Sequence, residues 1–409
     1  YYTIEVEENG SLTIVDKANN VTYKNQGILV ENGDDGDSFN YSPPRKDMEV
    51  FSNESKCTVK ISGSDIYDQA EIHFDMVVPA DLDERAEGKV SVTMLVDMTV
   101  ALRKDSKVID FNVKVDNKGL SHRLCVLFDS QIVSAFNYAD QQFGLIKRPN
   151  YYEKEMKLYM ESMNNKTEKK AGIQELANWA NDQSTWQEPP ISIEPTQSYV
   201  SLTDGKTGIA VIPQGVREYE VLDDSKIRLT LFRTYGFMGK ENLIYRPGRA
   251  SGERIIETPA AQLLKEMEFN FGFTSYAGDI NDSDIDTLAK QYNTNLEVYT
   301  YAEFLNGRLI FSQREIEGQN AKIHSLFETE GNLVVSAVKK AEEDDGYIIR
   351  LYNGKDHKDL DDKIKFNFDI KEAYYTNLKE EKTEEIKVEN NTISVKELSH
   401  CKFVTIWVK

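Results

Sequence analysis

Polar and aromatic side chains that could bind a sugar are crowded into residues 32–44, which read NGDDGDSFNYSPP. The three aspartates offer hydrogen-bond acceptors, Phe39 and Tyr41 offer flat apolar faces, and the diproline restricts the backbone at the exit. Acidic and aromatic side chains together are typical of sugar-binding sites. The same residues also favour an ordinary surface turn, because Gly, Asp, Asn, Ser and Pro stabilise tight backbone geometry. Both interpretations stay open on composition alone.

A second unusual segment spans residues 245–264 and reads YRPGRASGERIIETPAAQLL. It is too broken for one strand, so we expect a long loop between strands. Arg246 or Arg249 could project into a cleft and donate hydrogen bonds to sugar hydroxyls. The alternative is a surface network of arginine and glutamate pairs, which contributes little stability. Local chemistry does not separate these two interpretations.

Motifs for self-contained catalysis are missing from the sequence. The five histidines show no HExxH or other metal-ligand spacing, and no GxSxG elbow or phosphate-binding glycine loop is present. His122 follows a predicted strand end, where a hydrogen-bonded structural role is favoured over a catalytic one. Cys57, Cys125 and Cys401 have no CxxC spacing, so reduced thiols are expected. A glycosidase needs two carboxylates, but 69 acidic residues single out no pair.

The charge balance restricts the partners. The chain has 409 residues, of which 49 are basic and 69 acidic, so its formal net charge is −20. This charge argues against nucleic acid and against an anionic membrane, and it suits a neutral substrate. No apolar run reaches the roughly 18 residues of a membrane span. The chain opens at Tyr1 inside a predicted strand, so we expect it to be a fragment of a longer protein.

Alternation of apolar and polar residues predicts that β-strands form the framework. In IDFNVKVD (Ile109–Asp116) every second side chain is apolar, the pattern of a half-buried antiparallel strand. Similar runs make sheets the framework through about residue 275, and runs within 301–409, separated by regular turns, predict a small β-sandwich. Helical patterns are few: an insertion near 151–180 and a connecting helix within 276–300. KEEKTEEIK, residues 379–387, is expected to be an exposed hairpin flank.

Several motifs in sequence order resemble the C-terminal, all-β half of the α-mannosidases of glycoside hydrolase family 38, with the bacterial branch the closer match. The segments that carry this resemblance are NGSLTIVDKANNVTY (Asn9–Tyr23), GDDGDSFNYSPP, DNKGLSHRL (Asp116–Leu124), LFRTYGFMGKENLIYRPGRASGERIIETPAAQ (Leu231–Gln262) and SAVKKAEEDDGYIIRLYN (Ser336–Asn353).

The resemblance implies a parent enzyme that removes terminal α-mannosyl residues with retention, through a covalent glycosyl-enzyme intermediate and with a zinc ion in the reacting subsite. The family's nucleophile, acid/base carboxylate and zinc ligands belong to an N-terminal α/β barrel and the helical segment after it, whose motifs are absent here. The resemblance therefore implies that this chain has no catalytic residue, metal or cofactor of its own and is inactive alone, while the full-length enzyme holds zinc. It further implies a large galactose-mutarotase-like sandwich followed by a smaller sandwich.

The resemblance also places the two loops at a rim facing the barrel. There Asp37, Asn40 and Tyr41 could bond mannose hydroxyls, while Arg246 or Arg249 could complete the pocket. Alternatively, the loops only brace the domain interface. The expected partners are the protein's own N-terminal catalytic and helical domains and a mannose-containing oligosaccharide. A bracing role predicts an exposed apolar surface, through which a homo-oligomer could also form. The unpaired cysteines and the bacterial resemblance favour a cytoplasmic location.

Two other functions compete with this hypothesis. An autonomous carbohydrate-binding module would need an exposed aromatic platform, for which Trp186 is the candidate, whereas Trp407 is expected in the core. A mutarotase-like sugar enzyme would need a His and Glu pair converging on a concave sheet face. No histidine has a sequence context that suggests such a pair, and fold analogy alone is a poor warrant for function.

Overall fold

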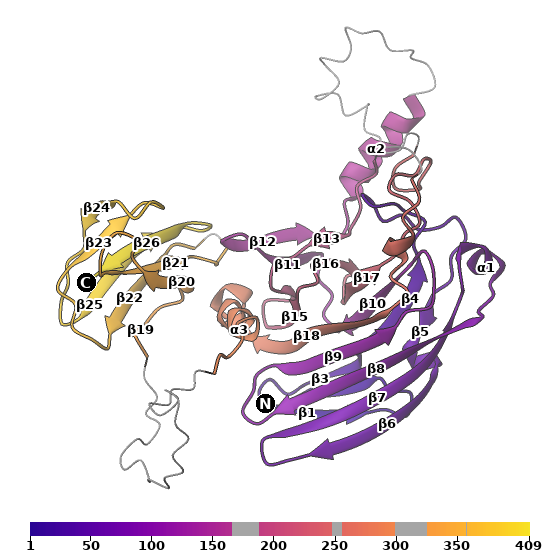
Figure 1. The fold of residues 1–409 in the computed structure, drawn as a ribbon, viewed down its shortest axis with the longest axis horizontal. Helices are drawn as coiled ribbons and strands as arrows, with labels where there is room; N and C mark the ends of the chain where they lie inside the picture. Colours follow the sequence, from indigo (N-terminus) through magenta and orange to yellow (C-terminus); the bar gives the residue numbers. More distant parts are fainter. Residues whose placement is uncertain (166–187, 248–255, 299–324, 357) are drawn as a thin grey trace, which may run out of the picture. The chain divides into compact units, whose positions relative to one another are not determined.

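The computed structural model describes residues 1–165, 188–247, 256–298, 325–356 and 358–409 (Figure 1). Two compact units divide the chain. Unit 1 comprises Tyr1–Gln141 and Ile146–Ile285, and unit 2 comprises Gln142–Leu145 and Asp286–Lys409. The strands of the described residues pair antiparallel throughout both units. The predicted all-β fold class is confirmed.

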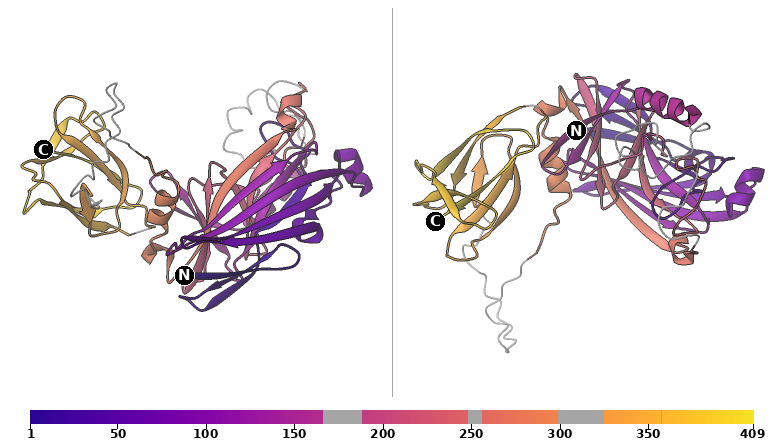
Figure 2. Two further views of the ribbon diagram at one scale, coloured as in Figure 1. Left: turned by 60° about the horizontal axis from the view of Figure 1, so that its bottom comes forward. Right: turned by 90° about the horizontal axis from the view of Figure 1, so that it is seen from above.

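Unit 1 is built on two large sheets, whose strands Figure 2 shows from two further sides. Among the described residues the larger sheet has nine strands, in the order β12 (Gly144–Pro149), β11 (Phe136–Gln141), β14 (Val200–Thr203), β15 (Thr207–Gln214), β18 (Glu266–Ala277), β9 (Ile109–Asp116), β8 (Val92–Arg103), β7 (Tyr67–Val78) and β6 (Lys56–Gly63). The second has six described strands, in the order β13 (Glu194–Pro195), β16 (Glu218–Leu222), β17 (Lys226–Arg233), β10 (His122–Asp129), β4 (Ile28–Gly33) and β5 (Val50–Phe51).

One apolar core joins these two sheets. Phe111 of β9 stacks on Phe271 of β18, with 5.2 Å between ring centroids, and meets Phe128 of β10 edge-on at 5.3 Å. A third sheet, of β1 (Tyr2–Val6), β2 (Leu12–Asp16) and β3 (Val21–Gln26), contributes Leu12 and Ile14 to the same core. Burial of this continuous apolar surface is the main stabilising term for the unit.

Unit 2 is a smaller sandwich with a separate core. Its described strands form a three-stranded sheet of β19 (Phe327–Thr329), β22 (Leu360–Phe366) and β25 (Thr392–Leu398), and a five-stranded sheet of β20 (Val334–Lys340), β21 (Tyr347–Tyr352), β26 (Phe403–Val408), β23 (Ala373–Thr376) and β24 (Lys382–Glu385). Ile364 and Ile393 of the first sheet and Ile406 of the second belong to one buried cluster.

Helices are few in the part of the chain that the structure describes. They are α1 (Leu82–Glu87), α2 (Glu153–Asn165) and α3 (Ile285–Tyr292). Short 3₁₀ turns also occur at Ser52–Glu54, Pro259–Gln262 and Ile280–Asp282. Helix α2 falls in the predicted insertion, and α3 falls in the predicted connecting segment. The rest of the insertion, residues 166–187, lies outside the described residues and includes Trp186.

The strand predictions agree closely with the structure. Strand β9 has the predicted bounds, and the four apolar side chains of IDFNVKVD are buried. Strand β24 is exposed at every residue, as predicted for the charged hairpin flank, and Trp407 is only 2% exposed. Strands β15 and β17 differ from a half-buried strand, since their six central residues are buried on both faces.

Candidate functional site

Two loops of unit 1 meet at one end of the six-stranded sheet, and strand topology brings them together. Strands β4 and β17 both pair antiparallel with β10, so they run parallel to each other and end at the same end of the sheet. The chain after β4, residues 34–49, forms loop 1. The chain after β17, residues 234–265, forms loop 2, of which residues 248–255 lie outside the described part of the structure. The two sequence segments singled out for sugar binding are therefore neighbours.

Three ion pairs fasten loop 1 to β17 and loop 2. Asp34 accepts two hydrogen bonds from Arg233, of 2.6 Å from Nε and 3.1 Å from Nη2. Asp37 pairs with Arg246, and Asp35 pairs with Lys240. The Arg233 Nη2 group also donates to two backbone carbonyls of loop 1, each at 2.9 Å. Each aspartate of the predicted sugar site therefore has a basic partner.

Asp37, like Asp34, has a fully buried side chain. Its carboxylate accepts backbone N–H groups of Phe39 at 2.9 Å, Asn40 at 3.1 Å and Lys240 at 2.9 Å, besides the Arg246 guanidinium. Burial alone would raise the pKa of Asp37, but these hydrogen bonds, led by that from Arg246, lower it below its ordinary value. Asp37 is thus held as a carboxylate that bridges the two loops.

Asn40 and Tyr41 have different surroundings. The Asn40 side-chain oxygen accepts a hydrogen bond from Arg246, while its amide lies 3.5 Å from Glu188 on a partly exposed surface. Tyr41 is only 7% exposed, and its hydroxyl accepts a 3.0 Å hydrogen bond from Asn32. The Arg123 guanidinium lies over the Tyr41 ring, 3.9 Å from its centroid.

The structure thus brings together the four predicted site residues that it describes. Asp37, Tyr41 and Arg246 are buried and bond protein groups, although Arg246 Nε has no partner among the described residues, and Asn40 is the one of the four that is partly exposed. Arg249 lies outside the described residues. Contact of these residues with a sugar stays a prediction.

A buried network that sequence reasoning missed anchors the far end of loop 1. Arg85 of α1 pairs with Glu31 of β4 and donates at 2.6 Å to the Met48 carbonyl. His122 lies between Glu31, 3.0 Å from its Nδ1, and Asn117, 2.8 Å from its Nε2. The structural role favoured for His122 fits this enclosed position. Arg85 gave no sequence signal, because its partner lies 54 positions away.

An apolar rim is formed by exposed side chains of the two loops. Phe39, Met238 and Ile256 are 58%, 39% and 46% exposed. They are neighbours, because the Ser38 amide donates to the Met238 carbonyl at 3.3 Å and the Met238 amide donates to Ile256 at 2.8 Å. A hollow of about 450 Å³ lies beside them, lined by residues that include Leu82, Phe237 and Leu264. Exposed apolar surface of this kind is typical of an interaction site.

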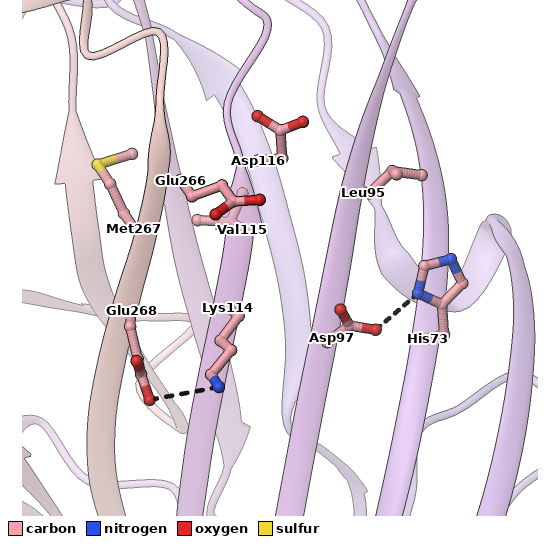
Figure 3. A pocket seen from close by; sticks show the side chains of 9 residues that line it. All are labelled: His73, Leu95, Asp97, Lys114, Val115, Asp116, Glu266, Met267 and Glu268. Atoms are coloured by element: carbon pink, nitrogen blue, oxygen red, sulfur yellow. Dashed lines mark hydrogen bonds and ion pairs between the residues drawn. The ribbon is translucent and has the colours of Figure 1, made fainter.

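A second hollow, of about 410 Å³, lies on the outer face of the nine-stranded sheet (Figure 3). His73 Nδ1 is 2.7 Å from Asp97, and Lys114 lies 3.9 Å from Glu268. Register places His73 and Glu268 on one row that crosses β7, β8, β9 and β18. Three strand spacings separate their backbones by about 14 Å. This separation is too large for His73 and Glu268 to form the converging pair of a mutarotase.

Metal-binding geometry is missing from the described part of the chain. No three His, Cys, Asp or Glu side chains there come together as a metal site. His73 comes nearest, yet its two carboxylate neighbours, Asp97 and Asp75, already bond both ring nitrogens. These residues do not fit zinc, so the zinc ion implied by the resemblance would need other ligands. No described helix is long and apolar enough to cross a bilayer.

Comparison with known sequences gives consistent matches over both units. Residues 1–237 match the model of the glycosyl hydrolases family 38 C-terminal domain, and residues 332–405 match that of the family 38 C-terminal β-sandwich domain. A putative mannosylglycerate hydrolase of Halalkalibacterium halodurans is 23% identical over 413 aligned positions, which cover 96% of this chain and 39% of that protein.

Solved structures with the same fold come from Enterococcus faecalis. An α-mannosidase of strain V583 has a TM-score of 0.74 and 20% identity, covering 100% of this chain and 41% of its own. A second structure, of a protein in glycosyl hydrolase family 38, has the same score and identity, with 43% of its chain covered. The chain therefore spans about two fifths of the length of these relatives.

Proposed function

The chain belongs to glycosyl hydrolase family 38, whose C-terminal domain model matches more than half of it, and we propose that it is the C-terminal β region of a retaining α-mannosidase. In this proposal the chain is non-catalytic, and the remaining part of a longer protein supplies the nucleophile, the acid/base carboxylate and the zinc site. The observation that carries the proposal is the match of both units, in order, to the two C-terminal family models.

Loops 1 and 2 would form one wall of the sugar pocket in the longer protein. The partly exposed amide of Asn40 is the group best placed to contact a mannose hydroxyl. Arg246 and Asp37 would act as positioning residues, since Arg246 holds the Asn40 oxygen and Asp37 holds Arg246. Arg249 remains the second arginine proposed to reach the sugar.

The apolar rim would be the docking surface for the catalytic part of the longer protein. The changes Phe39→Ser and Ile256→Ser should lower the unfolding temperature of the longer protein but leave that of the 409-residue chain nearly unchanged, because both side chains are exposed in the chain. Ile61→Ser is a matched control, since Ile61 is 71% exposed elsewhere on the surface. Equal effects of Ile61→Ser and Ile256→Ser would contradict the docking role.

Hydrolysis of an aryl α-mannoside tests the proposal directly. We expect the 409-residue chain to be inert with zinc present and the longer protein to be active. Asn40→Ala in the longer protein should reduce kcat/KM at least tenfold, whereas Asn367→Ala, in the small sandwich, should leave it unchanged. Turnover by the chain alone would place the catalytic centre within these residues and refute the proposal.

A second candidate substrate is mannosylglycerate, which the name of the Halalkalibacterium halodurans relative favours. Its glycerate carboxylate would be recognised by a cation, and Arg249 is the candidate. Arg249→Met should then reduce hydrolysis of mannosylglycerate much more than that of an aryl α-mannoside. Equal losses on the two substrates would favour recognition of the mannosyl group alone. A cytoplasmic location remains part of the proposal, and the three cysteines of the chain are free.

A further inference from the structure

A groove of about 590 Å³ lies on the outer face of the five-stranded sheet in unit 2. It is lined by the ends of β23 and β26 and by the turn between β23 and β24, namely Thr376, Asn377, Leu378, Lys379, Glu381, Phe403, Val404 and Thr405. Its volume is within the range of about 300–1,000 Å³ typical of small-ligand pockets. Neither family match nor the two loops of unit 1 assigns a role to it.

Strand register sets the floor of this groove. Thr376 of β23 pairs directly with Thr405 of β26, which pairs in turn with Arg350 of β21, so the three side chains lie in one row on the same face. The Thr405 hydroxyl accepts a 3.0 Å hydrogen bond from Arg350 Nε and keeps its own hydrogen free to donate. The floor therefore places two threonine side chains next to each other.

The Thr376 hydroxyl on this floor is left unsatisfied by the described part of the protein. Its oxygen is buried and has no hydrogen-bond partner among the described residues. A buried hydroxyl without a partner costs about 1–3 kcal/mol, so such a group calls for a physical explanation. Rotation about its Cα–Cβ bond would turn the hydroxyl into the groove, where a ligand or water could complete its hydrogen bonds.

An aromatic wall stands beside this polar floor. Phe403 is 37% exposed and packs on Phe143, with ring centroids 4.9 Å apart. Phe403 lies two positions before Thr405 on β26, so both side chains are on the same face. An exposed aromatic ring beside hydroxyl groups can stack on the C–H face of a sugar while the hydroxyls bond its polar edge.

The rim favours a neutral ligand. Its two charged residues, Lys379 and Glu381, have opposite signs, and the chain carries a net charge of −20, which disfavours polyanions. Asn377 closes the turn, because its side-chain oxygen accepts hydrogen bonds from the backbone N–H groups of Lys379 at 2.9 Å and Glu381 at 3.1 Å. The rim is therefore formed before a ligand arrives.

We propose that this groove is an accessory carbohydrate-binding site, in which Phe403 stacks on a sugar ring and Thr376 and Thr405 bond its hydroxyls. The choice of a mannose oligosaccharide as ligand rests on the proposed function, while the sugar class follows from the groove. The site would hold a distal residue of a glycan, apart from any residue that is being hydrolysed.

The test measures binding of mannotriose to the 409-residue chain by calorimetry and by saturation-transfer NMR. We expect binding that Thr376→Val weakens at least fivefold. Valine has nearly the shape of threonine, so Thr376→Val should leave the unfolding temperature unchanged or higher, because it removes an unsatisfied hydroxyl. Phe403→Ala should weaken binding at least tenfold, whereas Phe136→Ala, at a 43% exposed aromatic of the large sandwich, should not change it.

Three results would overturn the proposal. The first is that mannotriose, maltotriose and a galactose trisaccharide all fail to bind, and the second is sugar binding that is insensitive to Thr376→Val. The third is a dimer in light scattering that Phe403→Ala dissociates, which would make the groove an interface between copies. Failure of the proposed function is distinguishable, because it is measured as hydrolysis by the longer protein and depends on Asn40. Mannotriose binding that survives Asn40→Ala but not Thr376→Val would support the accessory site specifically.

Discussion

Arg246→Met tests whether the Asp37–Arg246 pair fastens loop 1 to loop 2. Methionine keeps the length of the side chain but removes the charge, which leaves the fully buried Asp37 carboxylate without its cation. Breaking a buried pair on one side costs about 3–5 kcal/mol. We expect about 3 kcal/mol, the low end of that range, because three backbone N–H groups still bond Asp37. At about 2–4 °C per kcal/mol, the unfolding temperature of unit 1 should fall by about 6–12 °C.

Lys240→Met is the matched control for this experiment. Lys240 and Asp35 are each 29% exposed, so loss of their pair should cost less than about 1 kcal/mol. The double variant Asp37→Asn/Arg246→Met should recover at least half of the stability lost in Arg246→Met, because it also removes the stranded charge. Urea and thermal unfolding of the 409-residue chain measure all three. If Arg246→Met were no more destabilising than Lys240→Met, Arg246 would not be a structural clamp, and its position in the site would need another explanation.

Three further predictions concern pH and backbone space. Because the pKa of Asp37 is lowered in the folded protein, the stability that Asp37 contributes is fully present above its ordinary pKa of about 3.9 and is lost as pH falls through the lowered pKa. Hydrogen exchange of the loop 1 amides should therefore accelerate only in strong acid. The hydrogen bond that His73 donates to Asp97 raises the pKa of His73, so the stability from this pair is present below about pH 6.5 and is lost as pH rises through the raised value. Asp97→Asn should lower the NMR titration midpoint of His73, and an unchanged midpoint would contradict this pairing. Gly36→Ala should destabilise the chain by about 1–3 kcal/mol in thermal unfolding, because its Cβ would lie 2.0 Å from the Asn40 carbonyl oxygen; a neutral result would show that loop 1 does not fold back in this way.

The framework of the molecule could be predicted because strand formation follows local patterns. Alternation in IDFNVKVD repeats every two residues, and that period alone fixes which side chains face the core. The limit of this reasoning appears at β17, whose six central residues are all buried. Period two predicts one solvated face, but Arg228 of β17 is buried and donates to Glu49 of loop 1, which lies 179 positions away in the sequence.

The sequence by itself determined the fold class, the order of the two sandwiches and the two polar segments that are candidates for sugar binding, whereas the pairing of β4 and β17 with β10 brought these segments together. It also identified the family motifs, because these are runs of neighbouring residues. Only the tertiary structure decided the partners: Asp37 meets Arg246 across 209 positions, and Arg233 reaches Asp34 across 199. The physical reason is that a side chain becomes a structural clamp or an open ligand contact according to burial and to the charge placed beside it. Both depend on strands that pair far apart in the chain.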